Sequence, residues 1–206
     1  MVPSVLYKYR PVENWKFVED IVSNRRLFAA TFRSLNDPME GLLYKHDKDV
    51  SLKYRKAVRN ASGRLNICSL CDSHDNTLLW SYYAGGHTGV AIGVRVLTQK
   101  SPRVDEPVEV RYDMTVNIDP KAEQTRSPSE IAKSVLGQKL TFWSHEKEYR
   151  AFTTQRFVPV EIVEVVLGCN ATKETAQAVR ALAARHLSGT TVKHLRRSEL
   201  QWPGYQ

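Results

Sequence analysis

The sequence lacks the features that mark a membrane or secreted protein. No apolar run approaches the roughly 18 residues needed to cross a bilayer. Residues 1–10 show no basic segment followed by an apolar one, so they do not resemble a signal peptide. The three cysteines are an odd number, which does not fit the disulfide framework of a small secreted protein. We therefore expect a cytoplasmic location and no membrane contact.

Common catalytic and metal-binding motifs are also missing. There is no glycine-rich phosphate-binding loop and no Gly-x-Ser-x-Gly elbow. Cys68, Cys71 and His74 have half the ligand spacing of a zinc site, but Cys169 stands alone and no second half follows. We expect no metal here and interpret Cys68 and Cys71 as buried thiols.

What the sequence does contain is typical of one soluble globular domain covering residues 1–206, with 42% hydrophobic and 25% charged residues. Its 30 lysines and arginines outnumber its 22 acidic residues, which gives a net charge of +8. A positive field favours polyanionic partners such as nucleic acid or a phosphate-bearing cofactor. A charge excess on an ordinary soluble surface is the alternative, and charge alone does not decide between the two.

Periodicity and capping residues predict many short elements. Apolar and polar residues alternate most clearly in 90–96, and Asn76 and Ser127 stand where helix caps are expected. The expected strands are residues 4–9, 27–30, 65–70, 90–96, 108–112, 146–152, 160–167 and 191–195. The expected helices are residues 15–24, 48–59, 76–84, 127–137 and a last one from 170 or 172 to 189, with loops at 34–40 and 114–127. Because strands and helices do not alternate regularly, we predict an α+β fold with mainly antiparallel strands in two packed sheets and flanking helices.

A late acidic segment, residues 143–150 (WSHEKEYR), is the first candidate site. On a strand, Glu146 and Glu148 point to the same face, where two like charges are unfavourable unless a cation or ligand uses them. The alternative is an exposed strand end in which Lys147 and Arg150 are ordinary partners.

Residues 80–89 (WSYYAGGHTG) form the second candidate site. A short aromatic helix leads into glycines, which allow a ligand to approach the backbone. Aromatic rings can stack on a flat heterocycle, and His87 can donate or accept a hydrogen bond. We interpret Trp80 as a core residue, and Tyr83 and His87 as candidates for ligand contact.

Five blocks, taken in order, resemble a widespread bacterial family of unknown function. They are residues 6–10 (LYKYR), 36–40 (NDPME), 80–84 (WSYYA), 87–89 (HTG) and 143–150 (WSHEKEYR). The resemblance covers residues 5 to about 168. A histidine is common in that family at the position of Tyr82. More distantly, the layout is similar to the ADP-ribosyltransferase superfamily, which has an early NAD-binding strand, a central aromatic element and a late Glu-x-Glu strand.

The distant resemblance implies a reaction on NAD. Glu148 would stabilise the positive charge that develops on the ribose when the nicotinamide bond breaks, and Glu146 would orient the acceptor or act as its base. Arg10 would hold the pyrophosphate or the adenosine ribose. Tyr83 and His87 would flank the nicotinamide. The remaining NAD-binding candidates are Tyr9, Asn36 and Asp37.

The acceptor implied by this resemblance is a macromolecule, with nucleic acid slightly favoured over protein by the charge, and such an activity suits a toxin or an anti-phage effector. One alternative is a nuclease or phosphoesterase that binds magnesium through Asp37, Glu40, Glu146 and Glu148. Another is a non-catalytic module that binds nucleic acid or a nucleotide. The sequence leaves the oligomeric state open.

Overall fold

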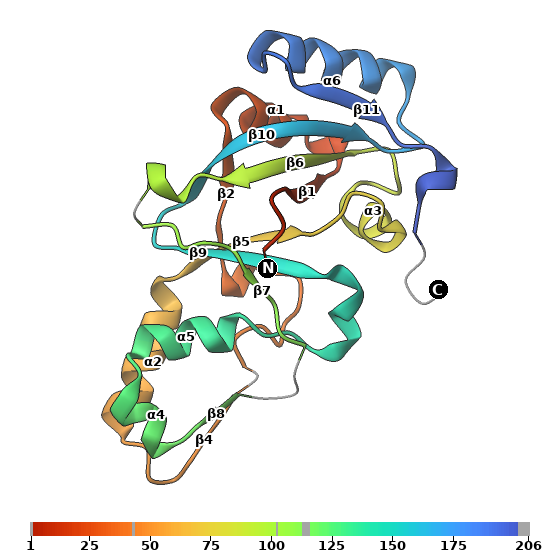
Figure 1. The fold of residues 1–206 in the computed structure, drawn as a ribbon. Coiled ribbons are helices and arrows are strands. Elements are labelled where there is room, and N and C mark those ends of the chain that lie inside the picture. The colour runs from red at the N-terminus through yellow and green to blue at the C-terminus, as the bar shows by residue number, and fades with distance from the viewer. Residues whose placement is uncertain (1, 43, 102, 113–115, 202–206) are drawn as a thin grey trace.

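The computed structural model describes residues 2–42, 44–101, 103–112 and 116–201 and shows an α+β fold (Figure 1). Its strands are β1 (Leu6–Arg10), β2 (Arg26–Phe28), β3 (Ala30–Thr31), β4 (Tyr44–His46), β5 (Asn66–Cys71), β6 (Val90–Val96), β7 (Val108–Glu109), β8 (Val116–Ile118), β9 (Glu148–Thr153), β10 (Phe157–Leu167) and β11 (Thr191–His194). Its α-helices are α1 (Trp15–Asn24), α2 (Leu52–Arg64), α3 (Thr77–Tyr83), α4 (Pro120–Thr125), α5 (Pro128–Leu136) and α6 (Lys173–His186). Short 3₁₀ turns are η1 (Val12–Asn14), η2 (Phe32–Ser34), η3 (Thr98–Lys100), η4 (Thr141–Glu146) and η5 (Arg197–Glu199).

Most strands pair in one nine-stranded sheet with the order β11-β10-β6-β1-β5-β9-β7, to which β2 adds beside β10 and β3 beside β5. All of these pairs are antiparallel except β10–β11. A separate parallel pair joins β4 and β8. The predicted α+β class with mainly antiparallel strands is therefore confirmed.

The sheet divides between β1 and β5. These two strands pair only at Tyr7 and Cys71, whereas β1 pairs along its whole length with β6, and β5 along its whole length with β9. Two halves result, β11-β10-β6-β1 and β5-β9-β7, but they belong to one sheet, whereas we expected two packed sheets from the sequence. The split leaves space beside the last residues of β1.

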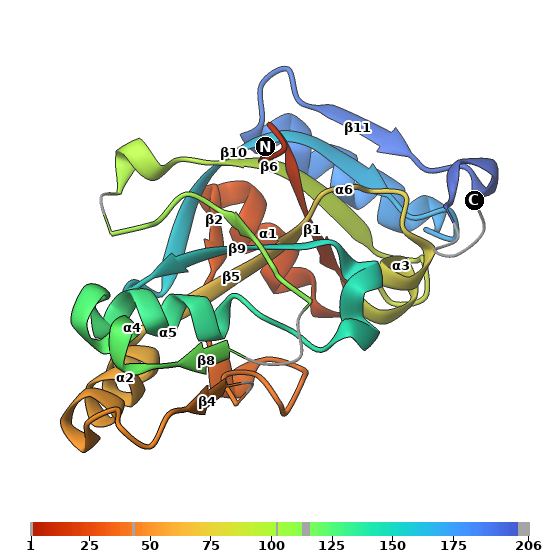
Figure 2. The ribbon, with the colours of Figure 1, turned by 60° about the horizontal axis from the view of Figure 1, so that its bottom comes forward.

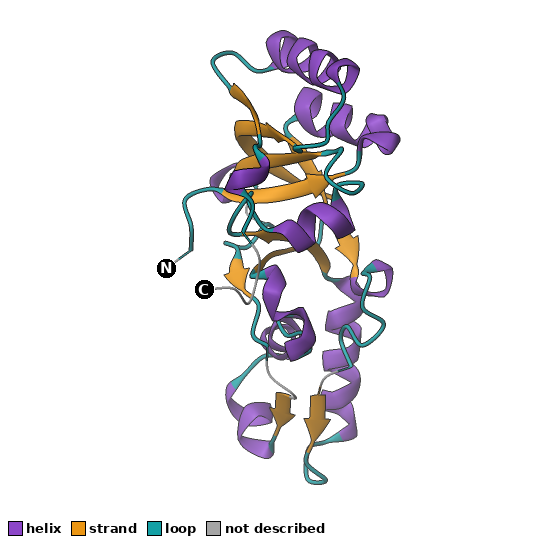
Figure 3. Ribbon diagram, turned by 90° about the vertical axis from the view of Figure 1, so that its right-hand side faces the viewer, coloured by secondary structure: helices purple, strands orange, loops and turns teal. Residues whose placement is uncertain are grey.

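Helices α1 and α6 cover one side of the sheet (Figure 3). In α1 the buried residues Val18, Ile21 and Val22 follow the i, i+3, i+4 spacing of an amphipathic helix. They share one apolar core with α6 and with strands β5, β6, β9 and β10. Helix α3 packs elsewhere, against β1, through the fully buried Trp80. The interpretation of Trp80 as a core residue is confirmed.

A smaller lobe below the sheet contains α2, α4, α5 and the pair β4–β8 (Figure 2). Its core contains Tyr54 and Val58 of α2 with Ile131 and Val135 of α5. The other face of α5 packs against Phe152 of the sheet through a further apolar cluster. Because α5 contacts both cores, it fixes the segment that follows it, residues 137–146, relative to β9.

Two predicted helix starts are confirmed in detail. The Ser127 backbone N–H donates to the Glu130 carboxylate at 2.7 Å and the Glu130 N–H donates back to the Ser127 hydroxyl at 3.3 Å, which is a complete capping box. At α3, the Asn76 side-chain oxygen accepts from the N–H groups of Leu78 and Leu79 at 3.0 and 3.3 Å.

Other predictions about local structure were wrong. The loop expected at 114–127 contains β8 and α4, although residues 114 and 115 lie outside the described residues. Asp119 caps α4 by accepting from the Ala122 N–H at 2.7 Å, and Pro120 takes the first helical position. The helix expected at 48–59 instead begins at Leu52, because Ser51 caps it, and continues to Arg64.

Two predicted strands are interrupted by a change of partner. The strand expected at 108–112 ends at Glu109, since the Arg111 N–H donates to the Gly137 carbonyl and not to a strand. The strand expected at 27–30 is broken at Ala29, where β2 pairs with β10 and β3 with β5. Among the described residues, none of the helices combines the length and the apolar character that a membrane crossing requires.

Candidate active site

A cavity of about 360 Å³ opens where the two halves of the sheet part. This volume lies in the lower part of the range of about 300–1,000 Å³ found for small-molecule sites. The cavity brings together the last residues of β1, the end of α3, the loop before β4, and residues of β5 and β9. Its lining residues are Tyr7, Lys8, Tyr9, Arg10, Phe28, Ala30, Ser34, Leu35, Asn36, Glu40, Ile67, Ser69, Leu70, Cys71, Leu79, Tyr83, Lys139, Glu146, Glu148 and Arg150.

Arg150 organises one end of the cavity. Its side chain is only 1% exposed, and its guanidinium forks onto both oxygens of Glu40, with distances of 2.6 and 2.8 Å. The same guanidinium contacts both oxygens of Glu148, at 2.8 and 2.9 Å, and donates to the Leu136 carbonyl. One buried cation thus fixes two carboxylates that are 110 and 2 positions away in the sequence.

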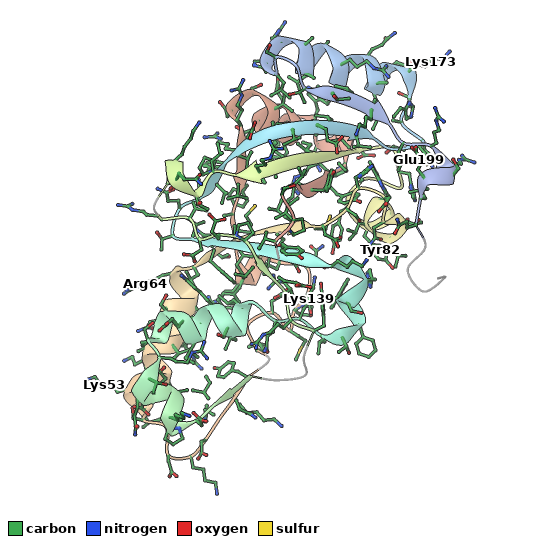
Figure 4. All side chains as sticks on the ribbon, viewed as in Figure 1. Lys53, Arg64, Tyr82, Lys139, Lys173 and Glu199 are labelled. Atoms are coloured by element: carbon green, nitrogen blue, oxygen red, sulfur yellow. The ribbon has the colours of Figure 1, made fainter. Side chains whose placement is uncertain are left out.

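Lys139 joins the two glutamates of the late acidic segment. Its ammonium bonds the Glu146 carboxylate and lies 3.3 Å from Glu148 Oε2. The other oxygen of Glu146 accepts from the Tyr83 hydroxyl at 2.7 Å. Lys139, which follows α5 and is labelled below β9 in Figure 4, has no motif of its own. Sequence reasoning therefore missed it, although two carboxylates expected on one face call for a nearby cation.

The path by which Glu146 reaches the cavity differs from the prediction. Glu146 ends the 3₁₀ turn η4 and is not part of a strand, and Lys147 has a left-handed backbone with φ of 43°. Strand β9 begins only at Glu148. The chain reverses between the two glutamates, so a turn and not strand alternation brings both carboxylates to Lys139. The alternative of an exposed strand end is wrong as well, because Glu146 and Glu148 are 4% and 5% exposed.

Glu148 is ionised across the physiological pH range. Burial alone raises the pKa of a carboxyl group, but the charges of Arg150 and Lys139 outweigh it and hold the pKa of Glu148 at about 2. Burial and the bond to Glu146 both raise the pKa of Tyr83, so this phenol stays protonated and donates. Tyr112, whose oxygen accepts from the Glu148 backbone N–H at 2.8 Å, supports the same residue from outside the cavity lining.

On the β1 side of the cavity, Lys8 and Arg10 add positive charge and form no salt bridge among the described residues, although the charge of Glu148 reaches Lys8. Within the described residues, the buried Nε of Arg10 has no hydrogen-bond partner, and no salt bridge involves Arg10. Lys8 donates to the Ser69 carbonyl oxygen at 2.6 Å. Burial, with the neighbouring charge of Arg10, lowers the pKa of Lys8 to about 8. The partly buried guanidinium of Arg10 has no acidic partner among the described residues, so this end is suited to an anionic ligand.

Six of the eight predicted site residues line this cavity: Tyr9, Arg10, Asn36, Tyr83, Glu146 and Glu148. They come together because β1 pairs with β5 only at Tyr7, so that its following residues approach α3 and β9. Tyr9 also donates its hydroxyl to the Ser73 carbonyl at 3.1 Å and packs its ring against Trp80.

The other two predicted residues, Asp37 and His87, do not line the cavity. Asp37 is buried, and one carboxylate oxygen accepts from the Met39 N–H at 2.9 Å, as expected of an Asx turn. His87 stacks on Trp80, with Nε2 3.2 Å from the Ser81 hydroxyl oxygen. The structure therefore does not bring His87 together with Tyr83 around one ligand.

The arrangement of cations disfavours the magnesium-dependent alternative. The carboxylates of Glu40 and Glu148 are both engaged by Arg150, and that of Glu146 by Lys139. A divalent cation at the same oxygens would meet these positive groups at close range. The two thiols of Cys68 and Cys71 are buried, as predicted, and burial raises the pKa of both.

Comparisons with known proteins give a likeness in fold only. A scan of protein-family models finds no match for this chain, and a search of curated proteins finds none either. Among solved structures, the chain is similar to DarT from Thermus sp. 2.9 in complex with NAD+, with a TM-score of 0.48 and 10% identity over 98% of this chain and 99% of that one. The same DarT in complex with ADP-ribosylated ssDNA gives 0.46 at 10% identity, over 97% of each chain. At these scores the likeness assigns neither a substrate nor a reaction to this chain.

Proposed function

We propose that this chain is an NAD-dependent ADP-ribosyltransferase that modifies a macromolecule, with nucleic acid favoured over protein as the acceptor. One observation carries the proposal: a single cavity contains a partly buried guanidinium, Arg10, whose Nε has no partner among the described residues, and a fixed, ionised carboxylate, Glu148. NAD offers a matching pair of groups, because its pyrophosphate is anionic and its nicotinamide ribose becomes cationic during cleavage.

Binding begins at the positive end. A guanidinium presents several N–H donors in one plane, which suits the oxygens of a pyrophosphate. Arg10 has donors to spare because its Nε is unpartnered among the described residues. Lys8 lies two residues before Arg10, on the same face of β1, and adds a second positive charge at the same end. Asn36, in the loop before β4, and Tyr9 of β1 complete the polar lining of the cavity.

Cleavage takes place at Glu148. As the bond between ribose carbon and nicotinamide nitrogen breaks, the electron pair leaves with neutral nicotinamide and positive charge develops on the ribose. Glu148 Oε1 accepts from Arg150 Nε at 2.8 Å, and a carboxylate oxygen has two lone pairs, so it can also accept from a ribose hydroxyl. A carboxylate already fixed by Arg150 stabilises this charge without reorganising.

Glu146 has a separate role in the proposed reaction. Its two oxygens are held by Tyr83 and Lys139 beside Glu148. From this position it orients the acceptor and takes the proton that the acceptor loses when it attacks the ribose carbon. The net charge of +8 favours an acceptor with phosphates. Chemistry of this kind suits a toxin or an anti-phage effector.

The test is nicotinamide release from NAD by the purified chain, measured with and without single-stranded DNA, RNA and protein acceptors. We expect release by the wild type and a loss of about 100-fold or more in Glu148→Gln, the size found when a preorganised electrostatic contact is removed. Glu161→Gln is the matched control, because Glu161 lies exposed on β10 in a 3.2 Å ion pair with Arg95. No release under any condition, or full activity in Glu148→Gln, would contradict the proposal.

A further inference from the structure

Aromatic side chains stand exposed beside the cavity. Phe142 in η4 is 84% exposed and Tyr82 in α3 is 60% exposed. Trp143 and His145 of η4 are half-buried between them. We call Tyr82, Phe142, Trp143 and His145 the aromatic strip. Burial of such rings is favourable, and a cluster of them left in water on a folded surface commonly marks a contact with another molecule.

The strip is an ordered surface and not a set of loose side chains. The rings of Tyr82 and Trp143 lie 6.2 and 6.1 Å from the ring of His145. His145 Nδ1 donates to the Phe142 carbonyl oxygen at 3.0 Å, since a carbonyl can only accept, and this fixes the turn that holds Phe142 outward. Asn76, the cap of α3, donates to the His145 carbonyl at 2.6 Å and so ties the turn to the helix.

The strip continues directly into the cavity. Tyr82 is followed by Tyr83, whose hydroxyl bonds Glu146, and the two tyrosine rings lie 6.3 Å apart. Lys139, which holds both glutamates, has its ammonium 4.8 Å from the Trp143 ring centre. Tyr82 and Trp143 thus each contact one of the two side chains that hold Glu146, the residue to which the proposed reaction brings the acceptor.

Positive charge lies at the α3 end of the strip. The Ser81 hydroxyl, beside Tyr82, lies 3.2 Å from His87 Nε2. Burial lowers the pKa of His87, and the nearby positive charge of Arg197 lowers it further. Arg197 donates at 3.1 Å to the neutral side-chain oxygen of Asn170, so that its charge is not cancelled there. Figure 4 labels Tyr82 on α3 and Glu199 on η5, the turn that begins at Arg197.

We propose that the aromatic strip binds unpaired bases of single-stranded nucleic acid and so presents the acceptor to the cavity. This inference rests on the proposed function. Aromatic rings stack on any base, and nearby cations contact the phosphates, which is the combination found in single-strand binding surfaces. Bases in a duplex are already stacked on one another, so a single strand is the form that this surface selects. A protein partner uses the same residue types, aromatic rings and arginine, and a wild type that binds no oligonucleotide would favour that alternative.

The experiment measures binding of short labelled single-stranded DNA and RNA by fluorescence anisotropy, without NAD. We expect the wild type to bind a single strand more tightly than the same sequence as a duplex. Tyr82→Ala with Phe142→Ala should weaken single-strand binding by about tenfold or more, since one stacked base contributes about 1–3 kcal/mol. Phe17→Ala is the control, because Phe17 is a 50% exposed phenylalanine on α1, and its affinity should equal that of the wild type.

Each outcome is decisive for the strip. Unchanged affinity in the double variant, equal loss in Phe17→Ala, or a preference for duplex would overturn the inference. If the wild type releases nicotinamide but binds no oligonucleotide, the strip proposal fails and the proposed function stands. If it binds single strands through the strip but never cleaves NAD, the strip is upheld and the transferase proposal fails.

Discussion

The charged side chains at the two ends of the cavity differ in whether they have partners of opposite charge. At the Glu148 end, every ionised group has a partner of opposite sign: Arg150 holds Glu40 and Glu148, and Lys139 holds Glu146 and Glu148. At the Arg10 end, Lys8 has only a carbonyl oxygen, and the buried Arg10 Nε has no partner among the described residues. The charges of the first end are balanced within the protein, whereas the second end has no acidic partner among the described residues.

The difference separates residues that hold the fold from residues that hold a ligand. A buried ion pair that loses one partner leaves an isolated charge and destabilises the fold strongly. A partly buried cation without an acidic partner already bears part of its desolvation cost, so its removal costs the fold little but weakens binding of an anion. Substitutions at the two ends should therefore divide into effects on stability and effects on affinity.

The largest effect on stability is expected at Arg150. In Arg150→Met, the buried carboxylate of Glu40 loses its cation and that of Glu148 keeps only Lys139, so the free energy of unfolding should fall by about 3–5 kcal/mol. Urea unfolding measures this change. Arg95→Met, which removes an exposed ion pair with Glu161, should cost less than about 1 kcal/mol. Equal unfolding midpoints for the two variants would show that the ion pairs at the Glu148 end do not stabilise the fold.

Arg10 should show the reverse pattern. In Arg10→Met, the dissociation constant for NAD should rise by about 10- to 100-fold, because charge-assisted hydrogen bonds contribute about 1.5–3 kcal/mol. The free energy of unfolding should stay equal or increase, since no protein partner of Nε is lost. Titration calorimetry and urea unfolding measure the two quantities. Arg59→Met, at an exposed position on α2, serves as control. A drop in stability with unchanged affinity would remove the contrast between the two ends.

A smaller effect is expected from the protonation of Lys8. Its pKa in the fold is about 8, so the side chain is charged at neutral pH and becomes neutral as the pH rises through this value. NAD affinity should therefore weaken by about fivefold between pH 7 and pH 9, as one charged contact is lost. In Lys8→Met this pH dependence should be absent. A wild-type affinity that is flat over this range would exclude Lys8 from the binding end.

The sequence predicted the elements that obey local rules. The caps at Asn76 and Ser127 and the alternating strand at 90–96 follow from side-chain chemistry within a few residues, and the structure confirms each. Helix α4 could have been found in the same way from Asp119 and Pro120, and was missed because its surroundings are polar.

The site was only partly predictable for a different reason. Glu148, Glu146, Arg10 and Tyr83 were identified from motifs, but the cation that joins the glutamates, Lys139, belongs to no motif. Its position depends on how α5 packs between two apolar clusters, which is a property of the tertiary structure. His87 is the opposite case. Its position after two glycines suggested a ligand contact, but in the structure its ring stacks on Trp80.

The most direct test of the central claim is a crystal structure with a NAD analogue whose nicotinamide–ribose bond cannot be cleaved. We expect the pyrophosphate within hydrogen-bonding distance of Arg10 and a ribose hydroxyl on Glu148 Oε1, inside the cavity where the two halves of the sheet part. An analogue bound elsewhere on the chain, or bound here with its pyrophosphate away from Arg10, would contradict it.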